Sequence, residues 1–169
     1  MKTLLLLRHG KSTWGDAWLD DFDRPLAPRG IKALLVMACV LDALPEVPGR
    51  IYVSPARRAL ETARGVARKM KKPPPIEEHP SLYLAEIPVF MELTQSLPEE
   101  LETVMYVAHN PGMEEFTDWL CCGTDRGAAS LRTANLAWLE LDVREWKETS
   151  SSCATLRALI PSRLMKSLF

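Results

Sequence analysis

The stretch Leu4-Leu5-Leu6-Leu7-Arg8-His9-Gly10 joins a short apolar run directly to a cation, an imidazole and a glycine. Four consecutive leucines predict a buried strand of the kind found in parallel sheets. The glycine relaxes backbone sterics just after the imidazole. Ligands of open α/β sheets bind outside the carboxyl ends of the strands, so Arg8 and His9 predict a site for an anionic substrate with a nucleophile or a base. Taken alone, the segment also fits a strand end with an incidental charge.

Length and composition are those of an ordinary globular chain. The 169 residues correspond to about one domain, and we expect a single domain over residues 1–169. Hydrophobic residues make up 47% of the chain and charged residues 25%, close to the usual values. The formal net charge is −1, which speaks against nucleic acid or a membrane as a partner.

The N-terminal leucines are too few for a secretory signal. Such a signal needs roughly 7–15 apolar residues, and no stretch of the chain reaches the ~18 residues expected of a membrane span. We therefore expect a soluble, cytoplasmic protein. The cysteines lack the ligand spacing of a zinc site and are predicted to be small buried thiols in a reducing compartment; they are Cys39, Cys121, Cys122 and Cys153.

Strand and helix patterns alternate along most of the chain. Strands are expected at 3–7, 51–53 and 103–108 and within 76–84, and helices at 31–44, 55–70, 87–97 and 113–121. Ser54-Pro55 is typical of a helix start, and the helix at 31–44 is apolar nearly all round, so we expect it to be largely covered. Two last strands, at 135–141 and 153–159, suit a hairpin or sheet edge. This order predicts a three-layer α/β/α fold with a mostly parallel central sheet and an antiparallel strand near the C-terminus.

Three of the expected strand ends carry unusual residues. Arg8-His9 follows the first strand, Ser54-Pro55-Ala56-Arg57-Arg58 the second, and His109-Asn110-Pro111-Gly112 the strand at 103–108. Parallel, adjacent strands would place all three segments at one edge of the sheet. Two imidazoles and two or three guanidinium groups there suit a phosphate dianion, which arginine binds with two parallel hydrogen bonds. Helix N-termini after two of the strands would strengthen the positive field.

This set of residues favours phosphoryl transfer without a metal ion or other cofactor. No acidic cluster accompanies the cations, so side chains rather than magnesium must neutralise the phosphate. A neutral imidazole can attack phosphorus and form a phosphohistidine, which divides one difficult displacement into two easier ones. The second histidine, if protonated, would bind the oxygens of the transferring group. Neighbouring arginines would lower the pKa of His9 and help to keep it neutral.

The same segments resemble the histidine phosphatase superfamily, also called phosphoglycerate mutase-like. Arg8-His9-Gly10-Lys11-Ser12 resembles the RHG signature, and residues 54–63 resemble the S-x-x-x-R-A-x-x-T-A segment. His109-Asn110-Pro111-Gly112 resembles the segment of the second histidine. RHG alone is a weak motif, but the three segments in order are a specific combination. The short length, Asp23-Arg24-Pro25-Leu26 and Leu82-Tyr83-Leu84-Ala85 resemble the small SixA-type branch, which includes protein phosphohistidine phosphatases.

The resemblance implies a role for each matching residue. His9 would be the transient phosphoryl acceptor, and Arg8, Arg58 and His109 would hold the phosphoryl group. The register of the second segment selects Arg58, and Arg57 is expected to be a solvated helix residue. The matching segments supply further candidate substrate-binding residues, namely Lys11, Ser12 and Asn110.

Two departures from the larger relatives concern the substrate. Those enzymes have R-H-G-x-S-x-x-N, whereas Gly15 stands here at the last position, and they carry long insertions for which this chain has no room. A compact, open site suits a bulky or protein-borne phosphate better than an enclosed metabolite. Trp14 and Trp18 follow the first signature and are expected to pack over the domain rather than edge the substrate opening.

The general acid for the leaving group is the least defined part of the site. Such an acid contributes typically about 10²–10⁴-fold in rate, and the candidates, each of which also fits an ordinary surface carboxylate, are Asp16, Asp20, Asp21 and Glu86. A phosphohistidine substrate depends less on a dedicated acid, because a protonated imidazole is a good leaving group.

Three functions follow from these residues. The leading hypothesis is a metal-independent phosphatase that works through a phosphohistidine intermediate on phosphoproteins, with phosphohistidine as the favoured substrate. The alternative is a phosphomonoesterase for a small phosphate ester, and the second alternative is a non-catalytic phosphate-binding domain.

Overall fold

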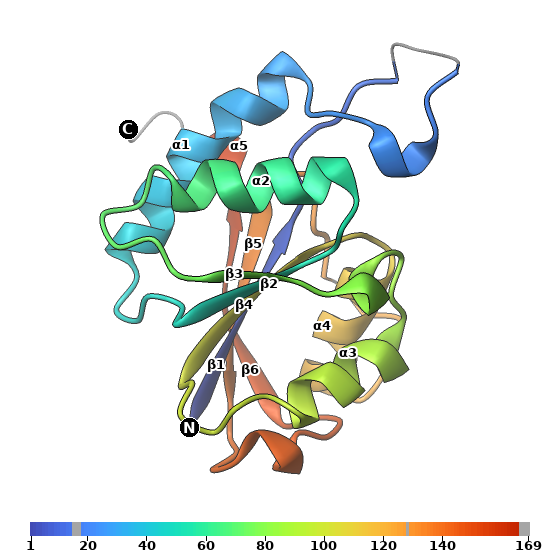
Figure 1. Ribbon diagram of the computed structural model, residues 1–169. Coiled ribbons are helices and arrows are strands. Elements are labelled where there is room, and N and C mark those ends of the chain that lie inside the picture. The colour runs from blue at the N-terminus through green and yellow to red at the C-terminus, as the bar shows by residue number, and fades with distance from the viewer. Residues whose placement is uncertain (15–17, 128, 166–169) are drawn as a thin grey trace.

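A six-stranded sheet runs through the centre of the molecule in the order β3-β2-β4-β1-β5-β6 (Figure 1). The structure is a computed structural model and describes residues 1–14, 18–127 and 129–165. The strands are β1 (Lys2–Arg8), β2 (Arg50–Val53), β3 (Ile76–Glu78), β4 (Thr103–Ala108), β5 (Asn135–Leu141) and β6 (Ala154–Pro161).

The pairing of the strands sets their carboxyl ends side by side. β1 pairs in parallel with β4, with Arg8 opposite Ala108, and β4 pairs in parallel with β2. β2 pairs in parallel with β3, while β5 runs antiparallel to both β1 and β6. The predicted α/β fold, mostly parallel with antiparallel pairing near the C-terminus, is confirmed.

Helices cover both faces of the sheet (Figure 1). α1 (Pro28–Ala43) and α2 (Arg57–Ala67) lie on one face, and α3 (Ile87–Gln95) and α4 (Gly112–Cys122) lie on the other. A short α5 (Ser162–Met165) follows β6 and contacts α1. Single turns of 3-10 helix occur at η1 (Asp21–Asp23), η2 (Pro80–Leu82) and η3 (Trp146–Glu148).

The leucine run explains why β1 is central. Leu5 and Leu7 pack with α1 and α2, whereas Leu4 and Leu6 pack with α3 and α4, and all four side chains are fully buried. Successive strand residues point to opposite faces, so an unbroken apolar run is required of a strand covered on both sides. Each of these leucines contributes about 1.5–3 kcal/mol through burial.

Two helices begin at residues other than those expected. α2 begins at Arg57 rather than at Pro55, and its N-cap residue is Ala56 rather than Ser54. Ser54 instead bonds across to the end of β4, which keeps it at the strand end. α1 begins at Pro28, earlier than expected, because proline is well suited to the first helical position.

Several side chains expected to be covered are exposed. Ile31 and Leu35 are each 54% exposed, because α1 packs only one face against the sheet and α2. Trp18 is 95% exposed, so the prediction that it packs over the domain is wrong. Trp14 is 76% exposed, but the guanidinium carbon of Arg24 lies 3.5 Å from the centre of its ring. Cys122 is exposed as well, contrary to the expectation of buried thiols.

None of the helices in the described part of the chain combines the length and the apolar character needed to cross a membrane.

Candidate active site

The ends of β1 and β4 and the first turn of α2 bring two histidines and an arginine together. The rings of His9 and His109 lie with their centroids 5.2 Å apart. Nε of Arg58 lies 3.3 Å from Nε2 of His9, and Nη2 of Arg58 lies 3.3 Å from Nδ1 of His109. The guanidinium group therefore lies against both imidazoles, as the convergence of the three segments predicts.

The hydrogen bonds of His9 fix which of its nitrogens carries a lone pair. Arginine can only donate, so Nε2 of His9 accepts from Arg58 and is unprotonated. Nδ1 then carries the hydrogen and donates to the carbonyl oxygen of Gly10 at 2.8 Å. The unprotonated nitrogen is thus the one that faces the guanidinium group.

The environment of His9 keeps the imidazole neutral. Burial lowers the pKa of His9 to about 4, helped by the charges of Arg58, Arg8 and Arg24 and opposed by the bond to Gly10. The direction agrees with the prediction, although burial contributes more than the arginines do. A neutral His9 at pH 7 is a nucleophile that needs no prior deprotonation.

His109 is held in the complementary arrangement. Its Nδ1 accepts from Arg58, so Nε2 carries the hydrogen and donates to the hydroxyl of Ser54 at 2.7 Å. Burial, together with the proximity of a second imidazole and the charge of Arg58, lowers the pKa of His109 to about 3. His109 is therefore neutral in the phosphate-free protein, and the protonated form stays a prediction for the complex with a phosphoryl group.

Arg58 is tied to the loop after β1 through Thr62. The Thr62 hydroxyl donates to the carbonyl oxygen of Arg58 at 2.6 Å and accepts from the amide of Gly10 at 2.9 Å. Arg58 and Thr62 belong to α2, so the bond from Gly10 to Thr62 holds this helix against the segment that carries His9. Arg57 points elsewhere, as expected, and forms an exposed ion pair with Glu61.

Arg8 and Asn110 hold the loop that precedes β5. Nη1 of Arg8 and Nδ2 of Asn110 both donate to the carbonyl oxygen of Leu131, at 2.8 and 2.9 Å. Among the described residues, Nε of Arg8 and Oδ1 of Asn110 are buried without a partner. Burial lowers the pKa of Arg8, yet a guanidinium group stays charged in proteins. Arg8 thus keeps donor capacity for an anion.

Two candidate substrate-binding residues, Ser12 and Lys11, have other surroundings than the two histidines and Arg58. Ser12 is buried, and its hydroxyl accepts from Nη2 of Arg24 at 2.6 Å, so it positions an arginine rather than facing a substrate. The side chain of Lys11 is exposed and lines a neighbouring cavity together with Arg29.

Of the acid candidates, Asp21 reaches the site. Its Oδ2 accepts from Nη2 of Arg58 at 2.9 Å and from the hydroxyl of Tyr83 at 3.0 Å, and its Oδ1 accepts from Arg24 at 2.8 Å. Burial works to raise the pKa of Asp21, but hydrogen bonds from Arg24, Tyr83 and Arg58 outweigh it and hold the pKa at about 2. Asp21 is thus an ionised partner of Arg58 and has no proton to donate.

The other carboxylates are less involved. Glu86 is exposed at the N-cap of α3, directly after Ala85, whose carbonyl packs against Gly112 beside the site. Asp20 is exposed at the N-cap position of η1, where its side chain makes no capping hydrogen bond, and Asp16 lies outside the described residues. No group of three or more His, Cys, Asp or Glu within 1–14, 18–127 and 129–165 is placed to hold a metal ion.

Three residues of the site were not among the candidates. Ser54 bonds His109, Tyr83 places its ring edge-on to His109 at 5.6 Å, and Arg24 bonds both Asp21 and Ser12. Ser54 has the same signal as His109, a polar residue directly after a buried strand, but its place before proline favours a helix cap. Arg24 and Tyr83 lie in the two segments, 23–26 and 82–85, that were cited only for their resemblance to the SixA-type branch and were given no role in the site.

Comparison with known proteins identifies the family. A family model described as histidine phosphatase superfamily (branch 1) matches residues 4–119. The chain belongs to the histidine phosphatase superfamily. A chloroplastic, uncharacterized protein of Arabidopsis thaliana is 31% identical over 157 residues, which cover 87% of this chain and 70% of that protein.

Solved structures of similar fold include SixA proteins. A protein histidine phosphatase SixA in complex with tungstate has a TM-score of 0.81 at 23% identity and covers 96% of this chain and 99% of its own. The proposed phosphohistidine phosphatase SixA of Agrobacterium tumefaciens has a TM-score of 0.77 at 23% identity, with 95% and 97% covered. A mutant phosphoserine phosphatase of Entamoeba histolytica in complex with phosphoserine has a TM-score of 0.63 at 15% identity, with 96% and 98% covered.

These matches confirm the predicted family and the predicted class of enzyme. As a member of the histidine phosphatase superfamily with its three signature segments, the protein is a phosphatase, and the non-catalytic alternative is set aside. The cytoplasmic location stays a prediction, since the Arabidopsis thaliana relative is chloroplastic.

Proposed function

We propose that this histidine phosphatase hydrolyses phosphoproteins, with phosphohistidine as the favoured substrate, through a phosphohistidine formed on Nε2 of His9 and without a metal ion. The observation that carries the proposal is the lone pair of Nε2, which faces the guanidinium group of Arg58 at 3.3 Å. Nucleophile and phosphate-binding cation are thereby adjacent before the substrate arrives.

The reaction begins with an exchange of anions on Arg58. A phosphoryl group that binds there takes the place of the Asp21 carboxylate, and Arg8 contributes a second guanidinium group. The lone pair of Nε2 attacks phosphorus, and the bond from phosphorus to the leaving nitrogen breaks. The leaving nitrogen keeps the electrons of that bond, and because the other nitrogen of the same ring carries a proton, the imidazole leaves as a neutral molecule. Water then attacks phosphorus, the bond to Nε2 breaks, and His9 regains its lone pair while phosphate leaves.

Binding of the phosphoryl group also changes the state of His109. Its pKa is low because it is buried beside positive charge, and a phosphate dianion next to the ring reverses the sign of that field. Nδ1 takes up a proton from solvent, stops accepting from Arg58 and donates to an oxygen of the phosphoryl group, while Nε2 keeps its bond to Ser54. The second histidine thus becomes a cation only when there is an anion to stabilise.

The substrate class follows from the state of the carboxylates. Among the described candidates Asp21 reaches Arg58, and it is ionised. An alkoxide leaving group gains about 10²–10⁴-fold from a general acid, whereas an imidazole that is already protonated gains little. The site therefore suits a phosphoramidate better than a phosphate ester.

A comparison of substrates tests this proposal. We would measure kcat/KM for a phosphohistidine-bearing protein, for free phosphohistidine and for a panel of small phosphate esters that includes phosphoserine, each with and without EDTA. We expect kcat/KM for the phosphoramidates to exceed that for the esters by about 10²-fold or more, with no effect of EDTA. A small ester that is preferred over both phosphohistidine substrates would establish the phosphomonoesterase instead, and loss of activity in EDTA would rule out the metal-independent route.

A further inference from the structure

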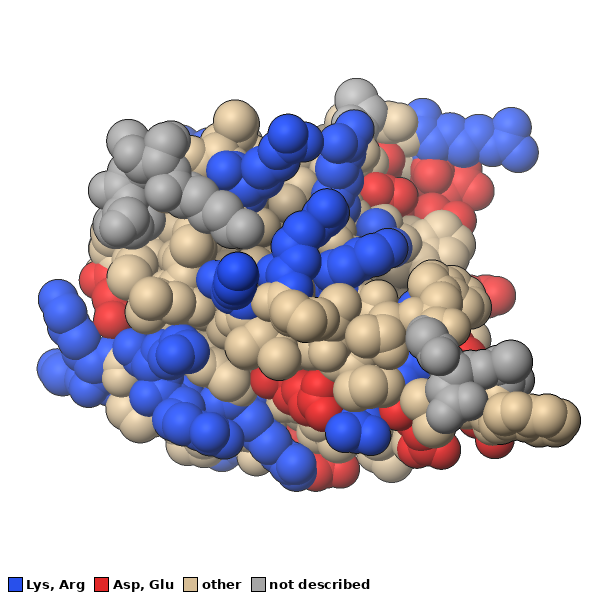
Figure 2. Space-filling view, turned by 90° about the horizontal axis from the view of Figure 1, so that it is seen from above, with Lys and Arg blue, Asp and Glu red and all other residues tan. Residues whose placement is uncertain are grey.

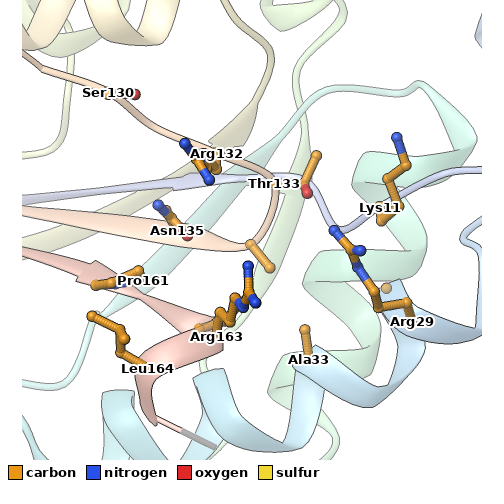
Figure 3. Close-up of a pocket in the computed structure, with 13 residues that line it drawn as sticks. Lys11, Arg29, Ala33, Ser130, Arg132, Thr133, Asn135, Pro161, Arg163 and Leu164 are labelled. Carbon is orange, nitrogen blue, oxygen red and sulfur yellow. The ribbon is translucent and has the colours of Figure 1, made fainter.

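A cavity of about 910 Å³ lies next to the segment that follows His9, and Figure 3 shows the residues that line it. Its walls come from four segments that are far apart in the sequence: the loop after His9, the first turns of α1, the loop at 130–135, and the end of β6 with α5. Nothing in the proposed reaction uses this cavity.

The walls of the cavity are strongly basic. Each of the four segments contributes a cation, and the cations are Lys11, Arg29, Arg132 and Arg163. Among the residues that the structure describes, no acidic side chain lines the cavity and no ion pair involves any of the four cations. Figure 2 shows basic side chains gathered on this side of the molecule. Because the net charge of the chain is −1, the cluster is a local feature.

The loop before β5 is a wall shared by the cavity and the active site. The Leu131 carbonyl anchors Arg8, and the amide of Ala134 donates to the carbonyl oxygens of Arg8 and His9, both at 3.1 Å. Ser130, Arg132 and Thr133 of the same loop line the cavity. A substrate that extends from His9 across this loop therefore reaches the basic walls directly.

The kind of ligand follows from the exposure of the cations. All four side chains are exposed, and an exposed ion pair contributes little by itself. A small anion would be held weakly here, whereas a chain with several carboxylates can pair with several cations at once. The first turn of α1, at Arg29 and Gly30, adds the positive end of a 16-residue helix.

We propose that the cavity is a docking subsite for an acidic segment of the phosphoprotein substrate, next to the phosphorylated side chain. This inference rests on the proposed function, since it assigns to that site a class of substrate. It predicts that acidic residues beside the phosphohistidine lower KM and leave kcat unchanged, because they act in binding and not at phosphorus.

A charge-reversal variant tests the subsite. The double variant Arg132→Glu/Arg163→Glu is compared with the wild type on two phosphohistidine peptides, one with acidic and one with neutral flanking residues, and on free phosphohistidine. We expect KM for the acidic peptide to rise about tenfold or more, with kcat and the activity on free phosphohistidine unchanged. The matched control is Arg68→Glu/Lys72→Glu, which makes the same change of charge at exposed positions outside the cavity.

The outcomes separate the subsite from the reaction. An equal rise of KM in the control would assign the effect to the net charge, and no rise in the double variant would overturn the subsite, as would a parallel loss on free phosphohistidine. If the wild type fails to hydrolyse free phosphohistidine, the proposed function fails, and binding of a hexaglutamate peptide then tests the subsite alone. We expect the double variant, and not the control, to lose that binding. Tighter binding of an RNA of equal charge, or of inorganic phosphate, would contradict an acidic peptide as the ligand.

Discussion

At the scale of single residues, the two nitrogens of His9 have different partners, and this difference defines the site. Nδ1 donates to the Gly10 carbonyl while Nε2 accepts from Arg58. The hydrogen bond from Nδ1 to the Gly10 carbonyl therefore leaves Nε2 unprotonated, with its lone pair directed at Arg58. The carboxylate of Asp21 completes the resting state, because it satisfies Arg58 until an anion replaces it.

Removal of that carboxylate is expected to favour anion binding. In Asp21→Asn, phosphate or tungstate no longer competes with an ionised side chain for Arg58. Arg58 is buried and Asp21 is partly exposed, and with about 1 kcal/mol for this ion pair we expect the inhibition constant of the anion to fall by about fivefold. Inhibition by tungstate measures this, with Asp23→Asn in the same 3-10 turn as the control. A fall of kcat by about 10²–10⁴-fold in Asp21→Asn would instead identify Asp21 as the general acid and contradict its assignment as a competitor.

Some of these residues are predictable from the sequence, and others are not. His9 and His109 are predictable because each directly follows an apolar run, and the sheet then brings them together. The bond from Asp21 to Arg58 joins residues 37 positions apart and depends on how an irregular loop packs, for which the sequence offers no periodic pattern. The exposure of Trp14 and Trp18 belongs to the same loop and is missed for the same reason.

At the scale of elements, close approaches of backbone fix where the helices meet the site. A Cβ on Gly112, at the start of α4, would lie 1.8 Å from the Ala85 carbonyl oxygen. The segment before α3 can therefore pack against the segment of His109 only if residue 112 has no side chain. α1 begins three residues before its predicted start and α2 two residues after, because each helix start contains a proline, and proline suits the first helical position.

A pair of glycine substitutions measures this constraint. Gly112→Ala is expected to destabilise the protein by about 1–3 kcal/mol, because the backbone must shift to accommodate the methyl group. Gly65→Ala in α2 meets only the flexible end of Leu34 and gains up to about 1 kcal/mol of helix propensity, so its effect should be smaller. Denaturant unfolding of the two variants gives both values, and equal stabilities would refute the role of Gly112.

At the scale of the whole molecule, the active site has a cost in stability at low pH. His9 and His109 have pKa values of about 4 and about 3 in the folded protein, against about 6.5 for an unfolded chain. Below pH 6.5 the unfolded state binds more protons than the folded state, so stability falls as the pH falls through this window. Keeping the nucleophile neutral therefore lowers the stability of the folded protein at acidic pH.

The loss of stability should be visible between pH 7 and pH 5. We expect the free energy of unfolding to decrease by roughly 2 kcal/mol for each of the two histidines. His109→Gln, which cannot titrate, should reduce this dependence by about half, as measured by denaturant unfolding at both pH values. A wild-type stability that is flat from pH 7 to pH 5 would mean that the imidazoles are not held neutral.

The most direct test of the account is to trap the phosphorylated enzyme. The protein is mixed rapidly with labelled acetyl phosphate or a labelled phosphohistidine peptide and quenched in alkali, which preserves phosphohistidine, and the labelled peptide is then identified. We expect an acid-labile, alkali-stable label on His9 that is absent from His9→Ala, a variant without turnover. Turnover in the wild type with no such label, a label on His109, or full activity in His9→Ala would contradict the assignment of His9 as the nucleophile.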